Sequence, residues 1–528
     1  MVGTQPIIIL RDNVERTRGQ EAQRSNIMAA KAIASAVRTT LGPRGMDKML
    51  VAPSGDVVIT NDGATILHEL SVSHPGAKMI VEVAETQDDE VGDGTTTACI
   101  LVGALMEEAE RMLEQKIHPT VISNGFRLGM NKALAILDAN AIISKGEDRD
   151  LLLKVAKTAV TGKSIEGVRD KISEIVVEAV TMVAEKKEDG TFVVDEDDIN
   201  IKTMIGDHID DAELVPGFII DKTRVDEAMP KKVANAKIAL LAQALEISKT
   251  QVKSKIKITS SEQMHAFSEQ EQEALKGLAD KIRATGANAV FCQKGISDPV
   301  QYYLAKQGIF AIQDVPEADM KALAKAVGGT IVNKPDDVDN GMLGTASMIE
   351  EMKEIKITKV SGCENPKTVS ILLKGGSQVL IDELERAVYD AQRVVQDALE
   401  DGKYIIGGGA IDTELSMQIR DYASTIGGRT QLAIEAFGRI FDSIPRTLAE
   451  NSGLDPIDVL VELKKAHSAG KKYAGIDVFT GKVTDMYKAG VIEPLRVKRQ
   501  AVQSGAEAAS MLVRVDDMMI TQSRAPKM

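Results

Sequence analysis

Apolar side chains recur at intervals of three and four residues over long stretches at both ends of the chain. In one of them, positions 98, 101, 102, 105, 106, 109, 112 and 113 are all apolar and would share one face of a helix. Helical spacing of this kind is present in five stretches, 17–40, 97–140, 412–424, 444–467 and 493–515. The pattern therefore predicts that the two ends of the chain are mostly helical.

The middle of the chain has a different pattern, a repeated unit of helix, glycine and short apolar strand. Between residues 271 and 333, helical stretches end at Gly286, at Gly308 and at Gly328-Gly329, and each is followed by a short run, NAVFCQ, IFAIQDV or TIVN. Glycine commonly ends a helix because it adopts a left-handed conformation at no steric cost. The pattern predicts an α/β layer domain.

A helical part whose two halves flank an α/β insert implies a discontinuous fold. The segments that join the two parts are 147–215, which contains acidic runs, and 368–400, which contains the strand-like VSILLKGG and a long helix. A joint that two crossing segments form is a natural place for a hinge.

A polar stretch, 244–276, lies within the middle part and holds only isolated apolar residues such as Ile256, Ile258, Met264 and Phe267. Its composition favours a solvated surface excursion. The alternative is an interaction arm whose sparse apolar side chains contact a partner.

The strongest candidate for chemistry is VEVAETQDDEVGDGTTTACILVGALMEEAERMLEQ, residues 81–115. It predicts a helix, a glycine loop and a second helix whose first turn is Gly94–Thr97. The free N–H groups of a helix N-terminus bind anions, and glycine lets a phosphate approach the backbone closely. Asp93 would repel a bare anion but suits one that carries Mg²⁺, which indicates ATP. The alternative is an ordinary Gly-Asp-Gly turn with Thr95 as a helix cap.

A second phosphate-binding candidate fails on its spacing. The residues TGKS at 161–164 resemble the end of a P-loop, but Lys157 stands where that motif needs its first glycine. The preceding LLLKVAKTAV also has helical spacing instead of a strand pattern. A P-loop is therefore excluded.

Three further segments could contribute to an anion site. They are LGPRGMDKML (41–50), VVITNDGATILHEL (57–70) and IIGGGAIDTEL (405–415), each with a glycine turn, in two cases directly before a helix. Each alone is more often a turn or a cap, and Asp62 could be only a cap. Asp390 forms an acidic stripe with Glu383 and Asp397, with arginines within four residues, which is typical of a solvated helix face.

Composition excludes several classes of function. The 528 residues carry a net charge of −14, with 3% aromatic residues and no Trp, which argues against a nucleic acid partner. The six histidines show no metal-ligand spacing, and no Ser/His/Asp or Cys/His nucleophile pattern is evident. Three widely spaced cysteines indicate a reducing compartment, and no apolar run is long enough for a signal peptide or membrane span. We therefore expect a cytoplasmic protein without a membrane partner.

The motifs together resemble the group II chaperonins, in particular the thermosome-like archaeal form. The resemblance rests on LGPRGMDKML, NDGATIL, AKMIVEVAETQDDEVGDGTTTA, GGR with QLAIEAF, IPRTLAENSGLDP and EPLRVKRQA, which occur in order along essentially the whole chain. It implies a multidomain α/β chaperonin fold. A mostly helical equatorial ATP-binding domain would span 1–146 and 401–528, a small α/β intermediate hinge domain 147–215 and 368–400, and an apical α/β substrate-binding domain 216–367. The polar stretch at about 244–276 would be the helical protrusion that serves as a lid.

The resemblance also implies an ATPase that uses Mg²⁺ and assigns its residues. Asp62 and Asp390 would be catalytic, and Asp93 would bind the metal. The expected nucleotide-binding residues are Leu41, Gly42, Pro43, Gly94, Thr95, Thr96, Thr97, Thr161, Gly162, Lys163, Gly408, Gly409, Glu493 and Lys498. Positioning of water, in-line geometry and a metal are what phosphoryl transfer needs.

The expected partners are other copies of the chain, in two stacked rings of about eight subunits with room for paralogous subunits, and unfolded or partly folded client proteins. ATP hydrolysis would drive closure of the ring cavity around the client. Two other functions stay open from the residues alone. One is a small-molecule kinase, which needs a second polar pocket, and the other is a ring scaffold with vestigial ATP sites.

Overall fold

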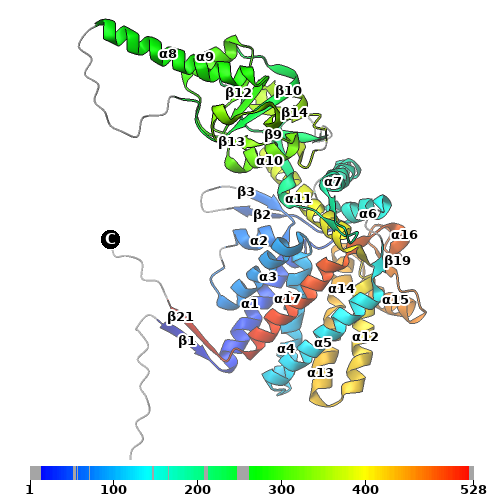
Figure 1. The fold of residues 1–528 in the computed structure, drawn as a ribbon. Coiled ribbons are helices and arrows are strands. Elements are labelled where there is room, and N and C mark those ends of the chain that lie inside the picture. The colour runs from blue at the N-terminus through cyan, green and yellow to red at the C-terminus, as the bar shows by residue number, and fades with distance from the viewer. Residues whose placement is uncertain are drawn as a thin grey trace, which may run out of the picture. The chain divides into compact units, whose positions relative to one another are not determined.

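The computed structural model describes residues 14–51, 55, 57–70, 72–144, 148–163, 166–206, 212–246, 261–364 and 366–521. The chain forms two compact units. The first combines the chain ends, Met1–Ser173 and Arg386–Met528, and the second is Glu174–Glu385 (Figure 1). The first unit is thus discontinuous, as the flanking helical patterns predicted. The division into three domains stays a prediction.

The first unit is mostly helical, as predicted. Its helices are α1 (Gln20–Arg38), α2 (Gly63–Glu69), α3 (Pro75–Val91), α4 (Thr95–Glu114), α5 (Pro119–Asn140), α6 (Arg149–Val160), α12 (Ala410–Ile426), α13 (Gly428–Ile440), α14 (Ser443–Asn451), α15 (Pro456–Ser468), α16 (Met486–Ala489) and α17 (Leu495–Arg514). Its strands are β1 (Val14–Arg18), β2 (Lys48–Val51), β3 (Val57–Thr60), β4 (Ile142–Ile143), β17 (Lys403–Ile406), β18 (Ala474–Asp477), β19 (Lys482–Asp485), β20 (Ile492–Pro494) and β21 (Asp517–Thr521).

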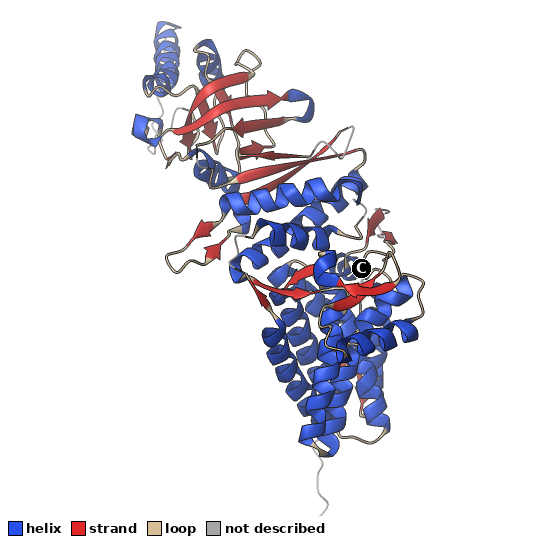
Figure 2. Ribbon diagram, turned by 90° about the vertical axis from the view of Figure 1, so that its right-hand side faces the viewer, coloured by secondary structure: helices blue, strands red, loops and turns tan. Residues whose placement is uncertain are grey.

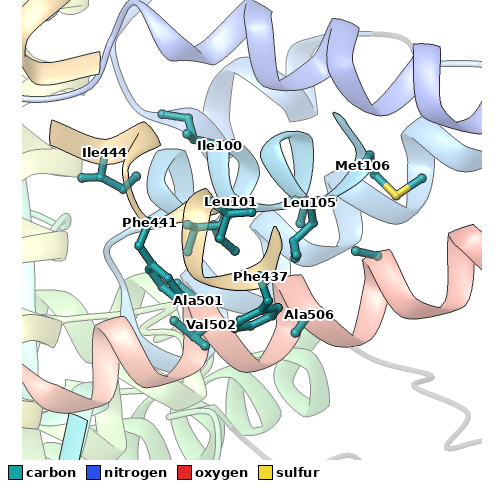
Figure 3. Close-up of a cluster of buried hydrophobic side chains, with 14 of the residues drawn as sticks. Ile100, Leu101, Leu105, Met106, Phe437, Phe441, Ile444, Ala501, Val502 and Ala506 are labelled. Carbon is teal, nitrogen blue, oxygen red and sulfur yellow. The ribbon is translucent and has the colours of Figure 1, made fainter. Parts of the chain in front are cut away.

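The core of this unit is built around α4. Its apolar face packs with α1, α3, α13 and α17, so helices from both chain ends share one hydrophobic cluster (Figure 3). Phe437 and Phe441 meet edge to face with their ring centroids 5.8 Å apart, and Leu101 belongs to the same cluster. The two chain ends also meet at an antiparallel pair, β1 with β21 (Figure 1). In this pair, the Arg16 side chain donates to the Asp517 carboxylate. Burial of this shared cluster is what brings the sequence-distant ends together.

Two of the five predicted helical stretches are each divided into two helices. The stretch 97–140 forms α4 and α5, and Pro119 begins the second of these. The continuous pattern over 444–467 is divided into α14 and α15, because Gly453 adopts a left-handed conformation (φ +72°) and Pro456 begins the next helix. Asp455 caps α15 by accepting hydrogen bonds from the N–H groups of Ile457 and Asp458. The apolar positions keep their helical spacing across this break, so the spacing alone does not reveal the break.

The second unit has the predicted α/β layers. Its main sheet, whose strands are red in Figure 2, has the strand order β12-β11-β10-β14-β15-β9, and β13 pairs with β10. These strands are β9 (Gly217–Ile220), β10 (Lys232–Leu241), β11 (Ala289–Cys292), β12 (Phe310–Ile312), β13 (Ile331–Val332), β14 (Gly344–Met352) and β15 (Ile357–Ser361). Along β10, Ile238 and Leu240 pack with α10 (Glu317–Val327), whereas Ala239 and Leu241 pack with α8 (Ser261–Ala284) and α9 (Asp298–Lys306). Helices therefore cover both faces of the sheet.

A smaller sheet in this unit unites the two expected hinge segments. Its order is β7-β16-β8, with β7 (Ile199–Ile205) parallel to β16 (Val369–Gly375) and β8 (Glu213–Val215) antiparallel to it. Helix α7 (Arg169–Val183) and helix α11 (Gln378–Asp401) each begin in one unit and end in the other, and the short strands β5 (Glu185–Lys186) and β6 (Phe192–Val193) follow α7. The strand and long helix predicted for 368–400 are confirmed.

The polar stretch 244–276 is helical where the structure describes its second half. Helix α8 begins at Ser261, and its Met264 and Phe267 side chains are exposed. Ile256 and Ile258 lie outside the described residues. No helix in the described ranges of the chain has the length and apolar character needed to span a membrane.

Candidate functional site

A cavity of about 630 Å³ in the first unit is lined by every residue predicted for the nucleotide site. These residues come from both chain ends. They are Leu41, Gly42, Pro43, Asp62, Asp93, Gly94, Thr95, Thr96, Thr97, Thr161, Gly162, Lys163, Asp390, Gly408, Gly409, Glu493 and Lys498. The volume is in the range of ordinary ligand pockets.

The N-terminus of α4 forms one wall of this cavity. Gly94 is the cap residue with φ +81°, and the N–H of Ala98 is the first to bond back within the helix, to the Gly94 carbonyl. The N–H groups of the three preceding threonines have no partner inside the helix by its geometry. They present a positive dipole end that suits phosphate oxygens.

Asp62 is both a helix cap and a cavity carboxylate. Its Oδ2 accepts a hydrogen bond from the N–H of Thr65 at 2.7 Å, and its Oδ1 accepts one from the Thr95 hydroxyl at 3.0 Å. Asp62 therefore caps α2, as its local sequence indicated, and also belongs to the cavity. The Thr95 hydroxyl already donates to this carboxylate, so it orients Asp62, and the exposed parts of Thr96 and Thr97 remain to contact a ligand.

Asp390 lies in the same cavity, on α11. Only 8% of the residue is exposed, and its carboxylate forms an ion pair with the Lys163 ammonium. Burial raises the pKa of Asp390 to about 8, although Lys163 opposes this shift. Burial alone would lower the pKa of Lys163, but the Asp390 and Asp93 carboxylates raise it above its ordinary value.

The interpretation of the α11 acidic stripe as a solvated face was therefore wrong. Glu383, Asp390 and Asp397 are all buried. Asp390 pairs with Lys163, and Asp397 pairs with Arg496 at 2.6 Å, so these partners come from distant segments instead of the same helix. Spacing along one helix cannot reveal such partners.

Lys163 is held in place by its neighbours in the loop. Gly162 has φ +89°, and an added Cβ there would lie 2.9 Å from the Gly42 carbonyl oxygen. The Asn61 side-chain amide donates to the Gly162 carbonyl at 2.7 Å. The loop that carries Lys163 thus touches the glycine turn at Gly42 directly.

The glycine triplet and the start of α17 form the opposite side of the cavity. Gly409 caps α12 with φ +80°, and an added Cβ there would lie 2.9 Å from Cβ of Pro445. Lys498 donates to both carboxylate oxygens of Asp412 at 3.2 Å. Burial raises the pKa of Glu493, while the Lys498 ammonium opposes the shift.

Sequence reasoning missed several polar residues of this lining, among them Asn61 and Asp412. Asp412 could have been found, because it lies in the first turn of a helix directly after the glycine triplet. Asn61 precedes Asp62 in the Asn-Asp-Gly turn and looks like an ordinary turn residue. Its bond to Gly162, about a hundred residues away, has no local signal.

The residues fit a magnesium-bound triphosphate. Asp93 is partly buried, and this desolvation raises its pKa, while its Oδ1 accepts a hydrogen bond from the Gly94 N–H at 2.6 Å. Within the described residues, no group of three or more His, Cys, Asp or Glu side chains could hold a metal ion alone. Magnesium commonly uses one or two carboxylates together with substrate phosphates and water, so one carboxylate beside a helix N-terminus is an adequate protein contribution. Such an arrangement can position water against a phosphate.

The fold and this cavity define a chaperonin, and comparison with known proteins gives the same answer. The profile of the TCP-1/cpn60 chaperonin family matches residues 33–523. The chain therefore belongs to the TCP-1/cpn60 chaperonin family, as its resemblance to group II chaperonins predicted. This membership confirms the predicted chaperonin fold and the predicted ATP-dependent protein-folding ATPase.

Its relatives include several thermosome subunits. Thermosome subunit beta of Archaeoglobus fulgidus is 53% identical over 98% of this chain and 95% of its own length. Thermosome subunit alpha of the same organism is 52% identical over 97% of this chain and 94% of its own length. Thermosome subunit alpha of Thermoplasma acidophilum is 49% identical over 100% of this chain and 96% of its own length.

Proposed function

We propose that the cavity of the first unit binds ATP with Mg²⁺ and hydrolyses it, and that this reaction drives the folding of client proteins. The observation that carries the proposal is that Asp62, Asp93 and Asp390, from three distant segments, line one cavity with the N-terminus of α4. A helix N-terminus holds phosphate, and carboxylates hold the metal and the attacking water.

Each group has a distinct task in this proposal. The α4 amides, with Gly42 and Gly94, hold the phosphates, and Asp93 holds Mg²⁺, which neutralises charge on the phosphates. Asp62 and Asp390 orient water, and Asp390 accepts its proton. Lys163 lies beside Asp390 and stabilises negative charge at the terminal phosphate. Gly408, Gly409, Glu493 and Lys498 hold the nucleoside.

The link from hydrolysis to client folding would pass through α11. Asp390 lies on this helix, which begins before Arg386 in the second unit. Engagement of Asp390 with the site would therefore move a helix that both units share, which is a form of hinge coupling. We retain the three-domain division 1–146 with 401–528, 147–215 with 368–400, and 216–367, with a lid at about 244–276.

The proposed assembly is a double ring of eight subunits each, with paralogous subunits possible, because the relatives include thermosome alpha and beta subunits of one organism. We place the chain in the cytoplasm, because Cys99, Cys292 and Cys363 form no disulfide and free cysteines are typical of a reducing compartment. Client proteins would bind through exposed apolar surface.

The variant Asp390→Ala tests the proposed chemistry. ATP binding should persist, and turnover should fall by about a hundredfold or more because the proton acceptor is lost. Asp382→Ala is the matched control, since Asp382 lies two turns earlier on α11 and does not line the cavity. Single-turnover hydrolysis of ATP measures both. Equal rates in Asp390→Ala and the parent protein would refute the assigned role.

A further inference from the structure

Gln87, which does not line the cavity, is tied to the loop that carries Asp93. It lies on α3 and is fully buried. Its Nε2 donates to the Asp93 carbonyl at 2.8 Å and to the Val497 carbonyl at 3.1 Å. One side-chain amide therefore connects the glycine loop before α4 with the first turn of α17, more than four hundred residues later in the chain.

The surroundings of this amide are tightly packed. Gly94 has φ +81°, and an added Cβ would lie 3.0 Å from the Gln87 Nε2 and 2.8 Å from a Val497 methyl group. The backbone of the loop therefore approaches the amide as closely as glycine allows. Any change in the position of the amide must move the loop or α17.

A buried amide at this position is also less favourable for stability than an apolar side chain of the same volume would be. Among the described residues, the buried Oε1 of Gln87 has no hydrogen-bond partner. A buried, unpaired polar atom is unfavourable, and a methionine would fill a similar volume without it. What Gln87 adds beyond volume is a pair of N–H donors for two backbone carbonyls.

We propose that Gln87 is a positioning residue for the magnesium-binding carboxylate. By holding the Asp93 carbonyl against α17, it fixes the direction in which the Asp93 side chain leaves the backbone. It also fixes the distance from this loop to Lys498, one residue beyond Val497 on α17. The inference rests on the proposed binding of magnesium and ATP, because its consequence is an ordered metal site.

The test uses Gln87→Met and Gln87→Glu in the full-length protein. Both variants keep the length of the side chain, but methionine has no donor, and a buried, protonated glutamate has one donor for the two carbonyls. Binding of a fluorescent ATP analogue is measured as Mg²⁺ is varied. The Mg²⁺ concentration for half-maximal binding should rise by on the order of 10- to 100-fold, as for other groups that orient metal ligands.

A second readout does not depend on metal or nucleotide. Hydrogen exchange of the amides at 93–97 should accelerate in the nucleotide-free variants, while exchange in α5 and α13 stays as in the parent. A purely structural role would instead lower protection throughout the unit. Gln503→Met is the control, because its amide donates to Glu507 on the exposed surface of α17.

The outcomes separate this inference from the proposed function. If the parent protein shows no Mg²⁺-dependent ATP binding, the proposed function fails, and hydrogen exchange alone decides whether Gln87 orders the loop. If the parent binds normally and folded Gln87→Met shows unchanged Mg²⁺ dependence and unchanged exchange at 93–97, the inference is overturned.

Discussion

At the scale of single residues, two carboxylates of the cavity are paired with lysines. Asp390 is paired with Lys163, and Asp412 with Lys498, in surroundings where an unpaired charge would be strongly unfavourable. Asp62 is held by neutral donors instead, the Thr95 hydroxyl and a backbone N–H. The site is therefore ordered by its own side chains.

The raised pKa of Asp390 predicts how catalysis depends on pH. A proton acceptor must be ionised, and burial raises the pKa of Asp390 to about 8. Turnover at low ATP should therefore increase as the pH rises from 6 to 9, with a midpoint near 8, because kcat/KM reports the free enzyme. The measurement is kcat/KM for ATP across this range at constant ionic strength. A profile that is flat, or that falls with rising pH, would contradict the role of Asp390 as base.

Glycine at 409 is predicted to be essential for both packing and nucleotide binding. In Gly409→Ala, the left-handed backbone is strained by about 1–2 kcal/mol, and the new Cβ meets the rigid Pro445 ring 2.9 Å away. Gly453→Ala is the matched control, because Gly453 is also left-handed (φ +72°) but has open space around it. The free energy of unfolding, measured with urea, and the affinity for ATP should both be lower in Gly409→Ala than in the control. Equal losses would show that the contact with Pro445 is unimportant.

How well single residues could be predicted depended on whether their signal was local. Gly94 and Asp93 were evident, because a glycine loop and the helix that follows it are adjacent in sequence. The local pattern around Asp390 indicated a solvated helix face instead of a site residue. Its partner Lys163 lies more than two hundred residues away and leaves no local signal. Only the resemblance to a known family identified it.

At the scale of elements, hydrophobic period predicted most of the helices and the repeated α/β units. Helices α9 and α10 and the strands that follow them lie where the glycine pattern placed them. The break between α14 and α15 was missed because apolar spacing is the same on both sides. Gly453 and Pro456 are residues that commonly end or begin a helix, but the regular spacing of apolar residues was given more weight.

The cap of α15 should contribute measurably to stability. Asp455 accepts two backbone hydrogen bonds at the start of this helix, so Asp455→Ala should destabilise the first unit by about 1 kcal/mol. Asp455→Asn, which keeps a capping oxygen, is the control and should lose only a small part of this. Thermal unfolding of the purified protein gives the comparison. If alanine and asparagine have equal effects, capping is not the cause of the stabilisation.

At the scale of the whole molecule, the two ends of the chain build one unit and one cavity. The shared core around α4 and the β1–β21 pair fix this arrangement, and the sequence predicted it from helical ends that flank an α/β insert. The individual contacts that hold the segments around the cavity together were less predictable. They include Asn61 with Gly162 and Gln87 with Val497, which join distant segments.

The proposed nucleotide site is tested most directly by an experimental structure of the assembled protein with Mg²⁺ and a non-hydrolysable ATP analogue. We expect phosphate density at the N-terminus of α4, metal density beside the Asp93 carboxylate, and Asp62 and Asp390 within reach of the terminal phosphate. A nucleotide bound elsewhere, or one whose phosphates point away from α4 at saturating concentration, would contradict this proposal.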